Sequence, residues 1–131
     1  MSLVLANGCF DILHVGHVWH LEEARKMGAR LVVSLTLDDH VNKGPGRPVY
    51  TWNERAAVLR ALRCVDEVVP SRNAWEAIES VRPNVFVKGI DYADHGLLPE
   101  RQACALVGAE IRFTRSPKLS ASETIKKVSQ L

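Results

Sequence analysis

Short apolar runs alternate with amphipathic segments along the whole chain. The apolar runs are rich in β-branched residues and predict strands over residues 2–6, 30–37, 67–70, 85–88 and 110–114. Apolar positions at helical spacing predict helices over 17–27, 53–63, 75–81, 99–107 and 121–128. Strands that alternate with helices form βαβ units, so we expect an α/β fold with a buried parallel sheet. Because no repeat or linker interrupts the pattern, residues 1–131 are expected to form a single domain.

One connection is much longer than the others. Residues 38–52 read DDHVNKGPGRPVYTW, a segment with glycines and prolines and no strand or helix pattern. Loops of this length in a compact domain are usually functional or disordered. We therefore expect the segment to contribute to a site, and to be mobile until a ligand orders it.

Composition argues against several classes of function. The formal net charge is +2, the basic residues are dispersed and no aromatic ladder accompanies them, so nucleic acid is not an expected partner. No apolar run approaches the roughly 20 residues that cross a bilayer, and the start of the chain lacks a signal-peptide pattern. Three cysteines without CxxC spacing predict a reduced, cytoplasmic protein.

The segment NGCFDILHVGH, residues 7–17, joins the first predicted strand to the first helix. In open parallel sheets ligands bind beyond the carboxyl ends of the strands, and the free N–H groups of a helix start favour an anion. The stripe of this helix that faces the sheet is predicted to consist of His17, Leu21, Ala24 and Gly28. Gly16 would let a ligand approach the backbone closely. Two imidazoles at this place therefore predict a phosphate-binding site.

Two other interpretations of the histidines are weaker. A lone histidine near a helix start is most often a cap, but a pair with glycine between favours a ligand site. A zinc site would use His14, His17 and His20, yet on a straight helix the outer two point about 120° apart. The GxxxxGK[ST] loop is missing, and KGPGRP neither follows a strand nor opens a helix, so neither common nucleotide fingerprint applies.

Four segments, in order, resemble the cytidylyltransferase-like nucleotidyltransferases. They are GCFDILHVGH (their HxGH signature), KGPGRPVYTWNERAAVLRALRCVDEVV (lysine, Arg-Pro, Glu-Arg and Val-Asp), VFVKGIDY (VKGGDY of the heptose 1-phosphate adenylyltransferase branch) and RSPKLSASETIKKV (the terminal R…STT…I motif). The resemblance implies a Rossmann-like, three-layer α/β/α fold. It also implies transfer of a nucleotidyl group from CTP or ATP to a phosphate monoester, with Mg²⁺ and release of pyrophosphate.

The resemblance assigns roles to the first loop. His14 and His17 would be catalytic residues that contact the triphosphate, in a transfer where the protein mainly positions groups and neutralises charge. Further nucleotide contacts, through backbone groups, are expected from Cys9, Phe10 and Gly16. Asp11 would orient the loop or serve the metal on the substrate side, and an N-cap role is equally compatible with its position.

Basic residues elsewhere complete the expected substrate site. Lys43, which shares the long loop with Arg47, is assigned to acceptor or triphosphate phosphates, and would otherwise be a solvated lysine. Arg55 and Arg63 lie eight positions apart on a predicted helix, so both are expected on one face as substrate contacts. Arg63 resembles a substrate-contacting arginine of the family, whereas Arg55 is also compatible with a structural pairing to an acidic residue.

The later nucleotide contacts are expected from Lys88, Gly89, Arg115, Ser120 and Ser122. Lys88 and Gly89 end a strand at the correct edge, although Lys88 would also suit a plain strand-end charge. Arg115 resembles the arginine that reaches the triphosphate, and we expect it to close a charge clamp with Lys43 over the phosphates. Ser120 starts a capping box with the glutamate three residues later, which is compatible with phosphate binding.

Two departures from the family pattern bear on the acceptor. S-T-T reads Ser120-Ala121-Ser122, and Ile90 replaces the second glycine of VKGGDY. The VKGIDY segment favours ATP and a sugar 1-phosphate. One alternative is a glycerol-3-phosphate cytidylyltransferase using CTP, although Ala77 stands near where that branch has a lysine, and another is a non-catalytic nucleotide-binding module. The sequence leaves the oligomeric state open, and a homodimer is compatible with it.

Overall fold

The computed structural model describes residues 2–94, 96–117, 119 and 121–131. Within them one sheet forms from parallel strands β1 (Leu3–Gly8), β2 (Arg30–Thr36), β3 (Glu67–Ser71), β4 (Val85–Gly89) and β5 (Glu110–Thr114). The helices are α1 (Val15–Arg25), α2 (Trp52–Arg60), α3 (Ala74–Val81), α4 (Leu98–Val107) and α5 (Ala121–Ser129), with 3₁₀ turns η1 (Asp38–His40) and η2 (Ile90–Tyr92). None of the helices described is both long enough and apolar enough to cross a membrane. The predicted parallel α/β fold is confirmed.

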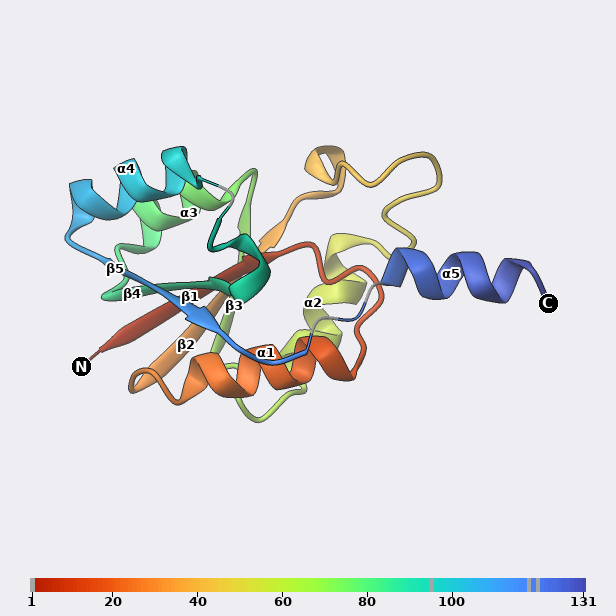
Figure 1. Ribbon diagram of the computed structural model, residues 1–131, viewed down its shortest axis with the longest axis horizontal. Coiled ribbons are helices and arrows are strands. Elements are labelled where there is room, and N and C mark those ends of the chain that lie inside the picture. The colour runs from red at the N-terminus through yellow and green to blue at the C-terminus, as the bar shows by residue number, and fades with distance from the viewer. Residues whose placement is uncertain (1, 95, 118, 120) are drawn as a thin grey trace.

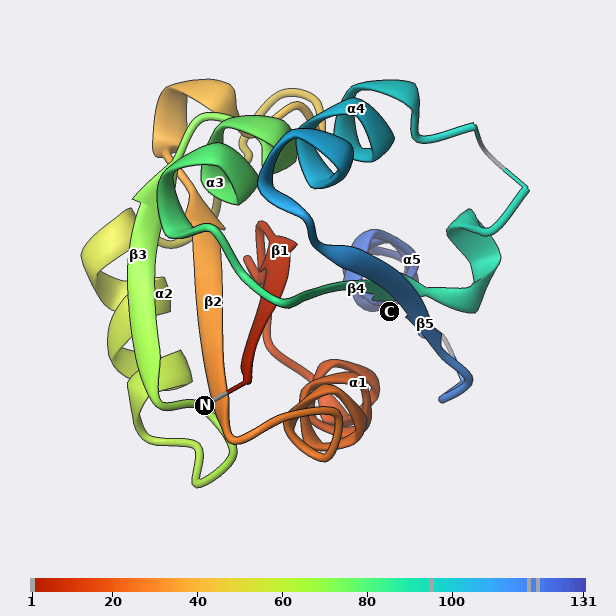
Figure 2. The ribbon, with the colours of Figure 1, turned by 90° about the vertical axis from the view of Figure 1, so that its left-hand side faces the viewer.

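Helices cover both faces of the sheet (Figures 1 and 2). Successive side chains of a strand point to opposite faces, so Val4 and Ala6 of β1 pack with α1 and α2, while Leu5 packs with α3 and α4. The buried helix residues are Leu21, Ala24, Ala56 and Leu59 on the first face, and Ala77, Ile78, Ala103 and Cys104 on the second. This arrangement confirms the three-layer, Rossmann-like fold.

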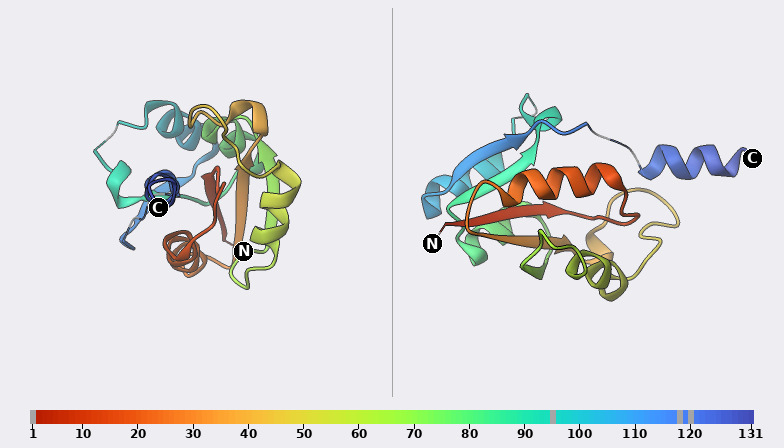
Figure 3. Two further views of the ribbon diagram at one scale, coloured as in Figure 1. Left: turned by 90° about the vertical axis from the view of Figure 1, so that its right-hand side faces the viewer. Right: turned by 90° about the horizontal axis from the view of Figure 1, so that it is seen from below.

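The strand order β3-β2-β1-β4-β5 reverses direction beside β1. The chain builds outward from β1 to β3, then crosses back to place β4 on the other side of β1. The loops that follow β1 and β4 therefore part at the carboxyl edge of the sheet, which is where open α/β sheets bind ligands. Helix α5 lies beyond this edge and extends away from the sheet (Figures 1 and 3).

Three boundaries that bear on the site differ from the prediction. Helix α1 begins at Val15, two residues earlier than predicted, because His14 is its N-cap. Strand β1 continues to Gly8. Helix α2 ends at Arg60, so Arg63 lies in the turn that follows it. The prediction that Arg55 and Arg63 share one helical face is therefore wrong.

Arg55 joins three segments of the chain from inside the fold. Its side chain is fully buried, and its guanidinium donates to the carbonyl of Cys9 at 2.8 Å and to the carbonyl of Tyr50 at 3.0 Å. It also donates to the Asp38 carboxylate at 2.5 Å. Of the two roles considered for Arg55 from the sequence, the structure shows the structural pairing to an acidic residue, here Asp38. It ties the loop after β1 to both ends of the long connection.

We expect Arg55→Met to lower the free energy of unfolding by about 2–4 kcal/mol, because each buried group left without its hydrogen-bond partner costs about 1–3 kcal/mol and Asp38 itself is 44% exposed. The substitution leaves Asp38 and two carbonyls without their donor. Arg60→Met, an exposed change on the same helix, is the control and should stay within about 1 kcal/mol. Urea unfolding of both variants measures the difference, and equal losses would contradict the role given to Arg55.

Candidate active site

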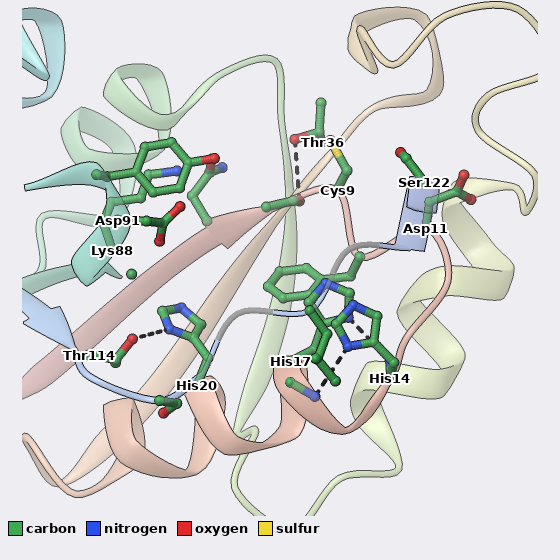
Figure 4. A pocket seen from close by; sticks show the side chains of 18 of the residues that line it. Cys9, Asp11, His14, His17, His20, Thr36, Lys88, Asp91, Thr114 and Ser122 are labelled. Atoms are coloured by element: carbon green, nitrogen blue, oxygen red, sulfur yellow. Dashed lines mark hydrogen bonds between the residues drawn. The ribbon is translucent and has the colours of Figure 1, made fainter. Parts of the chain in front are cut away.

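A cavity of about 380 Å³ opens at the carboxyl edge of the sheet (Figure 4). Its wall comes from the ends of β1, β2, β4 and β5, the start of α1, the long loop and the first turn of α5. The volume is in the range of small-molecule sites. The predicted site residues that line it are Cys9, Phe10, Asp11, His14, Gly16, His17, Lys43, Lys88, Gly89 and Ser122.

Other predicted site residues do not belong to this wall. Arg55 is buried in the fold as described above. Arg63 lies beside Glu22 in a separate shallow groove between α1 and the turn after α2, because α2 ends before it. Arg115 is exposed and is not among the residues that line the cavity. Its backbone N–H donates to the carboxylate of Glu23 at 3.0 Å. The predicted clamp of Arg115 and Lys43 over the phosphates therefore stays a prediction. Ser120 and its capping box fall outside the described residues.

His14 and His17 form a reciprocal cap at the start of α1. His14 Nδ1 accepts a hydrogen bond from the Gly16 N–H at 3.1 Å, and His17 Nδ1 accepts one from the His14 N–H at 3.2 Å. The two rings stack with centroids 3.8 Å apart. A neutral imidazole whose Nδ1 accepts carries its proton on Nε2. Each ring therefore keeps one N–H donor that the cap does not use.

Burial keeps this pair neutral. It lowers the pKa of His17 to about 4, with smaller contributions from the charges of His14, His20 and Lys43. Burial also lowers the pKa of His14, against a smaller opposing effect of the Leu119 backbone. At neutral pH the two rings thus act as hydrogen-bond donors. Nε2 of His14 is buried and, apart from its approach to the Leu119 backbone, has no hydrogen-bond partner of regular geometry among the described residues. A donor in this state is one that a ligand could satisfy.

Packing requires the glycine between the two histidines. A Cβ on Gly16 would lie 3.0 Å from Cε1 of His14 and 3.3 Å from the backbone nitrogen of Leu119. Gly16 was predicted to let a ligand approach the backbone closely. In the structure the His14 ring and the segment before α5 occupy the space beside it. A side chain here would therefore require the ring or that segment to shift by a few tenths of an ångström.

Asp11 holds the long loop over the cavity. Its side chain is fully buried and accepts hydrogen bonds from the N–H groups of Val49 and Tyr50, and from Nε of Arg47 at 2.6 Å. Burial alone would raise the pKa of Asp11, but these hydrogen bonds outweigh it and lower the pKa. Asp11 therefore orients the loop, as one of its expected roles required. Its alternative role as an N-cap is wrong, because His14 caps α1.

On the far side of the cavity, the predicted Lys88 is joined by Thr114 and Tyr92, which were not predicted, and by His20, which was considered only as a zinc ligand. His20 Nδ1 lies 2.6 Å from Oγ1 of the buried Thr114 at the end of β5, and burial lowers the pKa of His20. Lys88 Nζ lies 4.9 Å from the ring centroid of Tyr92. His20, Thr114, Lys88 and Asp91 gather on one side of Figure 4, and Asp11 and Ser122 on the other. The three-residue spacing in the sequence drew attention to His20, but it could not predict that His20 contacts Thr114 of β5.

The structure does not support a zinc site. Within the described part of the chain, no three side chains of His, Cys, Asp or Glu form a group that could hold a metal. Nδ1 of His14 and of His17 is used in the cap, and Nδ1 of His20 faces Thr114.

The low pKa of His17 makes a prediction about stability. The ordinary value is 6.5 and the folded value is about 4. Between these values the unfolded chain takes up a proton at His17 and the folded chain does not, so the free energy of unfolding should fall as the pH decreases through this window. His17→Gln keeps a side-chain acceptor at the third helical position and should flatten the decline. Urea unfolding across the window tests this, with the exposed His40→Gln as control. Equal slopes in wild type and His17→Gln would contradict it.

Comparison with known proteins identifies the family. The chain matches the family described as Cytidylyltransferase-like over residues 5–126. It is 50% identical over 100 residues to the bifunctional protein HldE of Koribacter versatilis, covering 73% of this chain and 21% of that protein. It is 44% identical over 115 residues to the bifunctional protein HldE of Photobacterium profundum, covering 85% and 24%. The chain thus spans about a fifth to a quarter of the length of these curated relatives.

Solved structures agree with the fold. The lipopolysaccharide core biosynthesis protein of Thermoplasma volcanium is 29% identical, with a TM-score of 0.73 over 92% of this chain and 99% of that chain. Pantothenate synthetase of Thermus thermophilus, 18% identical with a TM-score of 0.63 over 97% of this chain and 64% of that chain, shares the fold alone. The family match runs from β1 into α5 and includes the paired histidines. This chain therefore belongs to the cytidylyltransferase-like family.

Proposed function

We propose that this domain transfers a nucleoside monophosphate from ATP to a sugar 1-phosphate and releases pyrophosphate. The observation that carries the proposal is the stacked pair of neutral imidazoles at the N-terminus of α1, in the wall of the cavity. Two Nε2–H donors beside the positive end of a helix suit the charge that develops on phosphate oxygens during transfer. Membership of the cytidylyltransferase-like family supports nucleotidyl transfer in particular.

The reaction needs positioning more than covalent help. An oxygen of the acceptor phosphate attacks the α-phosphorus in line, the bond from that phosphorus to the bridging oxygen breaks, and pyrophosphate leaves with the electron pair. An ionised phosphate is already a nucleophile, so the reaction needs no carboxylate to act as a general base. Asp11 is buried and accepts hydrogen bonds from three donors, which agrees with a positioning role instead. His14 and His17 donate to the phosphates, while Lys43 and Lys88 neutralise charge.

The two sides of the cavity suggest how the substrates divide it. The side formed by β4, η2 and β5 contains Lys88 and the VKGIDY segment, and we assign it to the nucleotide. The resemblance of VKGIDY to heptose 1-phosphate adenylyltransferases favours ATP. The side under the long loop contains Lys43, and we assign it to the acceptor. A relative described as a lipopolysaccharide core biosynthesis protein is compatible with a sugar phosphate there.

We propose that Mg²⁺ enters with the triphosphate. Mg²⁺ is usually bound by substrate phosphates plus one or two carboxylates. The aspartates in the described wall of the cavity are Asp11, which accepts three hydrogen bonds, and Asp91, on the side assigned to the nucleotide. The donor set thus fits a magnesium site that is complete only with nucleotide. The ion would neutralise phosphate charge when bound.

The proposal is tested by measuring pyrophosphate release with each of four nucleoside triphosphates, with Mg²⁺, against a panel of phosphate monoesters. We expect turnover with ATP and a sugar 1-phosphate. Turnover with CTP and glycerol 3-phosphate would instead assign the domain to the cytidylyltransferase alternative. Nucleotide binding without pyrophosphate release on any acceptor would support the non-catalytic module.

Substitution of either histidine should impair the chemical step. His14→Asn and His17→Gln retain side-chain acceptors for capping but remove the Nε2–H donors. We expect each to lower kcat at least about 100-fold, the scale of losing one preorganised donor, with little change in thermal stability. His40→Gln, on an exposed 3₁₀ turn outside the cavity, should retain wild-type kcat. Near-full turnover in either active-site variant would remove that histidine from the mechanism.

A further inference from the structure

Arg47 is a buried cation in the wall of the cavity whose hydrogen bonds are incomplete. Its side chain is only 8% exposed. Nε donates to Asp11 at 2.6 Å, and Nη1 donates to Oγ of Ser122 in the first turn of α5 at 3.0 Å. Nη2 is buried and has no hydrogen-bond partner among the residues that the structure describes. Asp11 and Ser122, its two partners, lie on the same side of Figure 4.

A structural role explains only part of this arrangement. Linking the long loop to α5 accounts for Nε and Nη1, but it leaves Nη2 desolvated without an acceptor, which is unfavourable for a charged group. Asp11 is already occupied, because its oxygens also accept from Val49 and Tyr50. An acceptor for Nη2 must therefore come from outside the described chain.

A second orphan donor faces the same cavity. Nε2 of His14 is also buried without a described partner of regular geometry, and both His14 and Arg47 line the cavity wall. A neutral N–H donor and a guanidinium N–H together suit an anion with several acceptor oxygens. Arginine is well suited to phosphate because its planar group can hold one partner on one edge and bind oxygen with another.

We propose that Arg47 binds a phosphate group of the bound substrates through Nη2, and that Asp11 is the positioning residue that holds the guanidinium in place. The identity of that phosphate, on the nucleotide or on the acceptor, rests on the proposed function. Lys43 on the same loop is exposed in comparison. Arg47 is oriented before the ligand arrives, so less side-chain freedom is lost on binding. Through Ser122, a phosphate on Arg47 also connects the long loop to α5.

Calorimetric titration with sodium pyrophosphate, with Mg²⁺-ATP and with glucose 1-phosphate tests the proposal directly. Arg47→Lys retains a cation for Asp11 but not the planar fork, and Arg47→Gln removes the charge. We expect Arg47→Lys to weaken phosphate binding about 10-fold and Arg47→Gln to weaken it further. Asp11→Asn should weaken it as well, although Arg47 keeps its charge. Arg72→Lys and Arg72→Gln, at an exposed arginine paired with Glu76, are matched controls and should bind as wild type.

Each outcome separates the possibilities. Weaker binding of pyrophosphate and ATP assigns Arg47 to the nucleotide, and weaker binding of glucose 1-phosphate assigns it to the acceptor; either result supports the proposal. Affinities are compared per folded protein, at temperatures below the unfolding transition of every variant. If Arg47→Gln does not fold, Arg47→Lys decides. Unchanged affinities with a lowered Tm would overturn the proposal and leave Arg47 as a structural link.

The titrations require no turnover, so they fail or succeed independently of the proposed function. Loss of pyrophosphate binding in a protein that turns over no nucleotide would keep Arg47 as a phosphate ligand and overturn the transferase. Unchanged phosphate binding in the Arg47 variants of an active transferase would support the proposed function and overturn the role given to Arg47.

Discussion

The reciprocal hydrogen bonds between His14 and His17 are the interaction on which the site depends. A helix that starts at the carboxyl edge of a parallel sheet has backbone N–H groups without internal partners. Here the Nδ1 atoms of two imidazoles accept from two of these N–H groups, and this use fixes both tautomers. The fold and the proposed function therefore use the same rings: Nδ1 of each caps the helix, and Nε2 is left as a donor. Burial completes the arrangement by keeping both rings neutral.

Buried charged side chains build the rest of the cavity by bringing distant segments together. Arg55 reaches from α2 to the loop after β1, and Asp11 in that loop reaches back to Arg47 and the end of the long connection. Such pairs add little net stability, because desolvation offsets most of their attraction. Their effect here is geometric, since each pair allows only a narrow set of loop positions. The long loop is thus held in place at one end by Asp38, which accepts from Arg55, and near the other end by Arg47, which donates to Asp11.

Local patterns in the sequence were enough to predict the architecture and the centre of the site. Strand alternation and helical spacing depend on neighbouring residues, so the parallel sheet, its helices and the place of the HVGH segment followed from them. The carboxyl edge was predictable as well, because ligand position in open sheets follows from topology. The predicted capping of α1 was less accurate, since a histidine pair is an unusual cap and its Nδ1 atoms could not be located from spacing.

Side-chain partners were decided only by the tertiary structure. Arg55 and Arg63 look equivalent in the sequence, yet Arg55 is buried against Asp38, while α2 stops short and leaves Arg63 outside the cavity. Arg47 drew attention only as a neighbour of Lys43, although its partner Asp11 lies 36 positions away and Ser122 lies 75 positions away. Helical and strand periodicity reports which face a residue occupies. It does not report which distant charged group will contact that residue when β1 is placed between β2 and β4. Those contacts determine which cations are buried in the fold and which line the cavity.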